Sequence, residues 1–165
     1  MDILVFSDSH GRDDKIERLL SLQLQSPSAI FFLGDGLRDL SWIDTRGASV
    51  YSARGNCDAT FFDADDEILV ELGGKRIFAA HGHKYFVKSS YLQMAHRAAC
   101  LGADVMLFGH THVPLCTSIG EGERIGDITL SKRLHILNPG SLGYDGSFGN
   151  VVIRGGEILT SLGRL

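Results

Sequence analysis

The stretch "VMLFGHTHVP", from Val105 to Pro114, places a short apolar run before a glycine and two histidines. A run of this length that ends in turn-type residues is typical of a buried strand. Residues two apart in an extended segment point to the same side, so His110 and His112 can reach one centre together. Taken alone, the stretch favours the plainer interpretation of a strand followed by a polar loop, because single motifs often match by chance.

The same arrangement recurs along the chain. The apolar runs "ILVF", "AIFFL", "SVYSA" and "RIFAA" are followed by "SDSH", "GD", "RGNCD" and "HGH", and five of the seven histidines lie in these turns. The carboxyl ends of neighbouring strands in an open α/β sheet meet at one crevice, and glycine lets the backbone turn there. We therefore expect one shared polar site, and its candidate ligands are Asp8, His10, Asp35, Asn56, His81, His110 and His112.

The residue types in this set indicate metal chemistry. Carboxylates, imidazoles and an amide oxygen, without a thiolate cluster, suit divalent manganese, iron, zinc, nickel or cobalt. Seven ligands are more than one ion needs, whereas one shared carboxylate would give two ions four ligands each. Two ions about 3.5–4 Å apart can clamp the attacking and leaving oxygens of a phosphoryl displacement.

The order of elements predicts an α/β fold. Strands over 2–7, 28–35 and 48–56 alternate with a helix that begins at Asp13 or Asp14 and with a short helix in 36–47, a β-α-β-α-β order. The second half predicts a hairpin at 73–74, a helix over 89–102 capped by Ser89 or Ser90, and a strand over 103–109. Antiparallel strands then follow, the last pair turning at 155–156. We expect one domain, residues 1–165, with two packed mixed β-sheets flanked by helices.

The composition argues against nucleic-acid-binding, disulfide-rich and membrane proteins. The 165 residues suit one domain, and 16 basic against 20 acidic residues give a net charge of −4, which makes nucleic acid an unlikely partner. Three cysteines without paired spacing argue against a secreted disulfide scaffold. The first residues lack the basic region of a signal peptide, and the apolar runs are far shorter than a bilayer span. The expectation is a cytoplasmic protein that does not bind a membrane.

Five motifs, "DSH", "GD", "GNCD", "HGH" and "GHTH", appear in the order found in the calcineurin-like metallophosphoesterases, which the chain resembles. More narrowly, it resembles the small, cap-less prokaryotic phosphodiesterase subgroup, for which "NPGS" at 138–141 is also typical. The resemblance covers nearly the whole chain. It implies the metallophosphoesterase fold, a four-layer α/β/β/α sandwich, and a phosphoric ester hydrolase that cleaves phosphodiesters by attack of a hydroxide bridging two metal ions.

The resemblance also implies a role for each candidate ligand. One ion would be held by Asp8, His10, Asp35 and His112, and the other by Asp35, Asn56, His81 and His110, with Asp35 bridging the two. Manganese is the expected metal, with iron, zinc, nickel and cobalt as alternatives. The expected catalytic group is Asn56, Asp58 and His83.

One position departs from the wider family. Cys57 stands where that family usually carries a histidine taken as the acid for the leaving group, although the small subgroup shares the cysteine. The general acid is therefore unassigned, and Cys57 itself is more simply a packed thiol than a nucleophile. Asp58 can orient a ligand or a water. His83 can contact substrate, and a purely structural role for it is nearly as plausible.

Other residues have plain interpretations, and other functions stay open. Asp39 is expected to be a solvated helix charge, Trp42 a partly buried packing residue, and Asn138 and Ser141 turn residues beneath the site. The alternatives to a small-molecule phosphodiesterase are a phosphomonoesterase or nuclease with the same metals, and a non-catalytic protein-binding scaffold of the same fold. A scaffold has no reason to keep seven ligands. Homo-oligomers are possible.

Overall fold

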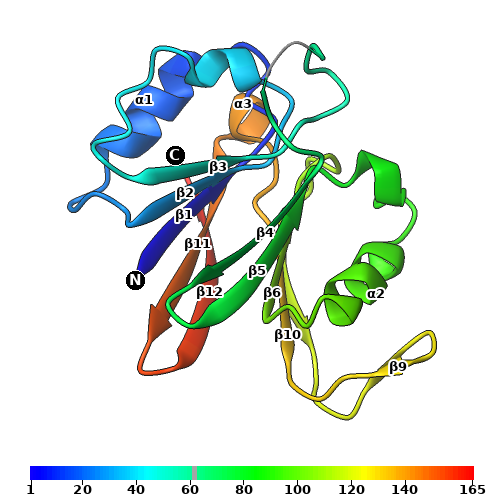
Figure 1. Ribbon diagram of the computed structural model, residues 1–165. Coiled ribbons are helices and arrows are strands. Elements are labelled where there is room, and N and C mark those ends of the chain that lie inside the picture. Colours follow the sequence, from blue (N-terminus) through cyan, green and yellow to red (C-terminus); the bar gives the residue numbers. More distant parts are fainter. Residues whose placement is uncertain (61–62) are drawn as a thin grey trace.

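Two five-stranded mixed β-sheets pack face to face in the computed structural model, which describes residues 1–60 and 63–165 (Figure 1). The first sheet has the order β12-β11-β1-β2-β3, in which β1, β2 and β3 are parallel and β11 and β12 antiparallel to their neighbours. Its strands are β1 (Asp2–Phe6), β2 (Ala29–Phe32), β3 (Ser49–Ser52), β11 (Ser147–Arg154) and β12 (Glu157–Arg164).

The second sheet has the order β4-β5-β6-β10-β7, with β5, β6 and β10 parallel and both edge strands antiparallel. Its strands are β4 (Glu67–Leu72), β5 (Lys75–Ala80), β6 (Val105–Phe108), β7 (Leu115–Ile119) and β10 (Leu134–Asn138). A small hairpin, β8 (Arg124–Ile125) and β9 (Ile128–Thr129), extends beyond the sheet near α2 (Figure 1).

The helices complete the four-layer α/β/β/α sandwich expected from the sequence. Helix α1 (Asp13–Ser21) covers the outer face of the first sheet, and α2 (Leu92–Cys100) covers that of the second (Figure 1). The short elements are η1 (Leu37–Leu40), η2 (His83–Tyr85) and α3 (Leu142–Asp145). Strand residues alternate between faces, so one side of each central strand fills the core between the sheets and the other packs against a helix.

Both glycine hairpins are confirmed, with β4–β5 turning at 73–74 and β11–β12 at 155–156. The predicted cap of the first helix is wrong. Arg12 directly precedes α1, and no side chain caps the helix. Asp13 and Asp14 lie inside the first turn, where their negative charges interact favourably with the helix dipole. Tyr91 directly precedes α2 and its side chain caps nothing, but Ser90 Oγ accepts a 3.2 Å hydrogen bond from Leu92 N, so the expected Ser90 lies one residue earlier and still satisfies a first-turn N–H. Helix α3 was not predicted, because four residues carry no helical periodicity. Within the described residues, no helix is long and apolar enough to span a membrane.

Candidate metal centre

The loops after β1, β2 and β6 have strained backbones at the expected ligands. Seven described residues other than glycine have a positive φ, and five of them are expected ligands: Asp8 (55°), His10 (48°), Asp35 (58°), His110 (66°) and His112 (59°). Left-handed φ is uncommon outside glycine, and strained residues gather at functional sites where the surrounding structure holds them. The backbone is thus bent to aim these side chains inward.

Glycines let the loops approach one another closely. A Cβ on Gly109 would lie 2.1 Å from Ser7 Oγ and 2.9 Å from Asp8 Oδ2. A Cβ on Gly55 would lie 2.1 Å from Asp35 Oδ1. Neither position has room for a side chain, which explains why glycine directly precedes two of the expected ligands.

The first group of ligand atoms comes from the β1 and β6 loops. Asp8 Oδ1 lies 3.0 Å from His112 Nε2 and 3.8 Å from His10 Nε2, and the two ring nitrogens are 3.4 Å apart. The other oxygen, Asp8 Oδ2, accepts a hydrogen bond from His110 N at 3.1 Å. Asp8 is fully buried, so one oxygen anchors the neighbouring loop while the other faces the two histidines.

The second group comes from the loops after β2, β3, β5 and β6. His81 Nε2 lies 3.4 Å from Asp35 Oδ2, 3.2 Å from Asn56 Oδ1 and 3.2 Å from His110 Nδ1. His81 Nδ1 donates to the carbonyl of Leu33 at 2.6 Å, since a carbonyl can only accept. This hydrogen bond fixes the ring orientation, as is usual for a metal-ligating histidine, and turns Nε2 toward the site.

Asp35 links the two groups. Its carboxylate forms one cluster of close ligand atoms with His81 and His110, and another with His10 and Cys57. Within each cluster, the ligand atoms lie within 4.8 Å of one another. Its Oδ1 accepts a 2.7 Å hydrogen bond from Cys57 N. The structure therefore brings all seven expected ligands together, with Asp35 between the two sets.

The crowding of these groups shifts their pKa values. Burial would raise the pKa of Asp35, but hydrogen bonds from His81 and Cys57 hold it well below its usual range. Burial lowers the pKa of His81, yet Asp35 and Asp8 outweigh this and raise it. Burial and the neighbouring His81 lower the pKa of His110 to about 4, so His110 is neutral at pH 7, as a metal ligand must be.

The donor set fits divalent metal ions. Asn56 Oδ1 and His110 Nδ1 each lie 3.2 Å from His81 Nε2. Because Nδ1 of His81 carries a proton, its Nε2 and Asn56 Oδ1 are both acceptors, and a cation between them would satisfy both. Asp35 and Asp8 raise the pKa of His81, so their carboxylates favour a positive charge at this place. A metal ion would supply the same positive charge while ligating all three atoms.

Other polar residues hold the loops from behind. Asn138 Nδ2 donates to Gly109 O and Thr111 Oγ1, both at 2.9 Å, and Ser141 Oγ donates to Asp8 O at 2.8 Å. This bears out their interpretation as turn residues beneath the site. Asp39 is not the solvated charge expected, because its Oδ2 accepts hydrogen bonds from Ser9 Oγ (2.5 Å) and Gly11 N (2.8 Å).

The expected catalytic side chains have distinct surroundings. Asp58 accepts four backbone hydrogen bonds, all 2.8 Å long, from the loops that carry Asp35 and Asn56. The His83 ring centroid lies 5.4 Å from that of His81, and burial and His81 lower the pKa of His83. Cys57 is exposed rather than packed, and partial desolvation and Asp35 raise the pKa of its thiol.

Two hollows adjoin the centre and share His10. One, of about 490 Å³, is bounded by the loops after β2 and β3, including Arg38, Asp39, Cys57 and Ala59. The other, of about 390 Å³, lies on the α3 side and is lined by Ser9, His10, Arg12, Gly143 and Tyr144. Sequence reasoning did not single out Tyr144, since a lone tyrosine in a loop carries no motif. Trp42, expected to be partly buried, is 88% exposed.

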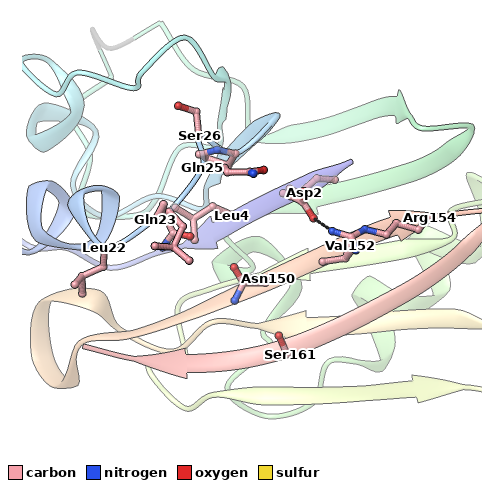
Figure 2. Close-up of a pocket in the computed structure, with 13 residues that line it drawn as sticks. Asp2, Leu4, Leu22, Gln23, Gln25, Ser26, Asn150, Val152, Arg154 and Ser161 are labelled. Carbon is pink, nitrogen blue, oxygen red and sulfur yellow. Dashed lines mark hydrogen bonds and ion pairs between the residues drawn. The ribbon is translucent and has the colours of Figure 1, made fainter.

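A further hollow, of about 550 Å³, lies away from these loops (Figure 2). It is bounded by β1, β11 and the segment 22–27, and the Asp2–Arg154 ion pair closes part of its wall. None of the seven expected ligands lines it. The ligand-bearing loops and not this hollow therefore define the candidate site.

Comparison with known proteins agrees with this geometry. The calcineurin-like phosphoesterase superfamily domain matches residues 1–153. The chain belongs to this superfamily. A probable metallophosphoesterase, YsnB of Bacillus subtilis, is 32% identical over 145 residues, covering 86% of this chain and 75% of that protein. Phosphodiesterase YfcE of Escherichia coli is 27% identical over 147 residues, covering 73% of this chain and 74% of that protein.

Solved structures share the fold. A predicted phosphoesterase from Streptococcus pneumoniae superposes with a TM-score of 0.76 at 24% identity, covering 99% of this chain and 88% of that one. Vps29 of Entamoeba histolytica, complexed with zinc, superposes with a TM-score of 0.73 at 18% identity, covering 99% of both chains. The chain is thus a phosphoesterase-family protein with a metal-binding donor set.

Proposed function

We propose that this protein is a dinuclear metal-dependent phosphodiesterase. The observation that carries the proposal is the position of Asp35, whose carboxylate belongs to two clusters of ligand atoms at once. A carboxylate shared in this way is what two neighbouring cations need, because its charge offsets their mutual repulsion. The superfamily membership and the likeness to YfcE support hydrolysis of a phosphate ester.

The seven side chains would divide between two ions, for which manganese is the expected metal. The set Asp8, His10, Asp35 and His112 would hold one, and the set Asp35, Asn56, His81 and His110 the other. When bound, such ions activate water and neutralise charge that develops on the phosphoryl oxygens. The chain's own contribution is to fix these ligands on strained, tightly packed loops.

The two hollows favour a diester over a monoester. A phosphodiester carries a substituent on each side of its phosphorus, whereas a monoester carries one. Both hollows include His10, so a phosphate at the centre would have space for a group toward Arg38 and Ala59 and for another toward Tyr144.

Proton transfer to the leaving group has no strong donor among these residues. The raised pKa of Cys57 leaves its thiol protonated but weakly acidic, and the lowered pKa of His83 leaves that imidazole neutral at pH 7. Esters whose leaving groups have low pKa values need no acid and should react best. We propose His83 as a substrate contact and Asp58 as a residue that positions Asp35.

The test combines metal content with substrate choice. Chelated protein should lose hydrolysis of bis(4-nitrophenyl) phosphate and regain it with manganese at two ions per chain, with 4-nitrophenyl phosphate cleaved more slowly. Asp63→Asn, at an exposed position, is the control and should change neither metal content nor substrate choice. Full activity in protein free of metal would refute the proposal, and faster cleavage of the monoester would refute the diester preference.

A protein-binding scaffold is the main alternative. The fold is shared with Vps29, but likeness at 18% identity shows the fold alone. The convergence of all seven ligands favours an enzyme, because a scaffold does not need strained backbone at five ligand positions. The net charge of −4 disfavours a nuclease.

A further inference from the structure

The ring of Tyr144 lies against two of the expected metal ligands. Its centroid is 5.2 Å from that of His112 and 5.9 Å from that of His10, and the side chain is 74% exposed. Among the described residues, its hydroxyl forms no hydrogen bond. A large, mostly exposed aromatic side chain beside a reactive centre has a free face for a substrate.

The position of Tyr144 is fixed by its backbone. Leu142 N donates to Ser7 O (2.9 Å) and Gly143 N to Asp8 O (3.0 Å), so α3 docks on the loop after β1. A Cβ on Gly143 would lie 2.3 Å from Ser9 O, so only glycine permits this approach. The contacts that shape the Asp8 loop therefore also place Tyr144.

The hollow beside Tyr144 suits an uncharged group. Arg12 also lines it, but both Arg12 Nε and Nη2 bind the carboxylate of Asp14 at 2.8 Å, which offsets the charge of the guanidinium. The volume of about 390 Å³ accommodates a planar ring. A flat, uncharged substituent can stack on Tyr144 here, whereas a second phosphate would find no free cation in the wall formed by Arg12.

We propose that Tyr144 is a specificity-determining residue that stacks with an aromatic substituent, an aryl group or a nucleobase, of the phosphodiester. This inference rests on the proposed function, since it places the phosphate at the metal centre. Stacking of a base on an aromatic side chain increases affinity, and at the lower end of the known range the increase is roughly five- to tenfold. We use the lower end because the other face of the stacked group would be open to solvent.

Binding of simple phosphates to the manganese-loaded full chain tests this role by affinity and not by a catalytic rate. Titration calorimetry would compare phenyl phosphate, methyl phosphate and inorganic phosphate at a pH where the two esters are dianions. The wild-type protein should bind phenyl phosphate about five- to tenfold more tightly than methyl phosphate. Tyr144→Leu should abolish this preference and Tyr144→Phe should keep it, with the affinity for inorganic phosphate unchanged in both.

The outcomes separate this inference from the proposed function. An unchanged preference in Tyr144→Leu, in a protein that still hydrolyses diesters, would overturn the stacking role alone. A preference that depends on the ring at 144, in a protein that hydrolyses no ester, would support the stacking role and overturn the phosphodiesterase proposal. Failure of the wild-type protein to bind inorganic phosphate would overturn both.

Discussion

Both carboxylate oxygens of Asp58 face backbone amides, and one of them accepts a 2.8 Å hydrogen bond from the N–H of Asp35. The same oxygen accepts from Gly55 N, and the other accepts from Gly36 N and Leu37 N. One side chain thus joins the loop after β2 to the loop after β3. Asp35 occurs in two of the groups of close ligand atoms, one with His10 and one with His81, so we infer that Asp58 positions the proposed shared ligand from behind.

Replacing Asp58 with Asn should therefore damage both stability and metal binding. The side-chain amide would place its NH2 group against two backbone N–H donors, which then lose their acceptor. A hydrogen bond to a charged group contributes roughly 1.5–3 kcal/mol to stability. We expect a lower thermal midpoint without metal and weaker manganese binding. Asp63→Asn, at an exposed position, is the matched control. Normal manganese affinity in Asp58→Asn would show that Asp58 does not position Asp35.

The sequence indicated which side chains lie together at this site because their signal is local, and their binding of metal stays a prediction. Each expected ligand follows an apolar run, and the parallel order of β1, β2 and β3 brings the ends of these strands together. The layers of the sandwich were predictable for the same reason, since apolar runs and glycine turns mark the strands. Which ion each ligand holds stays a prediction.

The supporting residues were not predictable in the same way. Asp39 and Ser9 are 30 residues apart, and their hydrogen bond depends on how two loops pack. Positive φ at Asp8 or His110 has no signature in the sequence, because these residue types usually adopt ordinary backbone angles. Tyr144 is positioned by α3, which has four residues and is too short to show a helical pattern of apolar residues in the sequence.

Gly55 should be essential for metal binding although it carries no side chain. A Cβ there would lie 2.1 Å from Asp35 Oδ1 and 2.4 Å from Asp35 N, so Gly55→Ala must displace the shared carboxylate. Overpacking of this kind costs about 1–3 kcal/mol, and we expect the variant to fold with reduced manganese stoichiometry. Gly120→Ala, where the Cβ meets only the flexible end of Glu123, should bind manganese normally. Two ions per chain in Gly55→Ala would contradict the assigned geometry.

Stability should depend on Asp104 in a pH range set by its pKa. Burial would raise the pKa of this carboxyl, but hydrogen bonds from Lys132 Nζ (2.7 Å) and Arg76 N (2.8 Å) lower it overall. A carboxyl whose pKa is lower in the folded state stabilises the protein above its unfolded pKa of about 3.9, and this stabilisation is lost as the pH falls through the folded pKa.

Asp104→Asn should thus reduce the free energy of unfolding at pH 6, and its difference from the wild type should shrink as the pH falls below about 4. Asp2→Asn removes a comparable but exposed ion pair, with Arg154, and should have little effect at either pH. Urea unfolding at several pH values measures both variants. A difference for Asp104→Asn that does not change with pH would mean that its ionisation does not stabilise the fold.

The bridging role of Asp35 is tested by comparing its loss with the loss of a ligand to one ion. Two doubly charged ions about 4 Å apart repel by about 4 kcal/mol even at the dielectric constant of water, and more in a half-buried site. Asp35→Asn removes the negative charge between them, whereas His112→Ala removes one neutral ligand from the cluster with Asp8 and His10.

At equal added manganese, Asp35→Asn should therefore bind fewer ions and lose more activity than His112→Ala. The measurements are metal stoichiometry after gel filtration and initial rates with bis(4-nitrophenyl) phosphate, with Asp63→Asn as an exposed control that keeps both. If Asp35→Asn keeps two ions and near-normal turnover, Asp35 does not bridge. The proposed division of seven ligands between two ions then fails with it, because among the described residues no other carboxylate occurs in two of the groups of close ligand atoms.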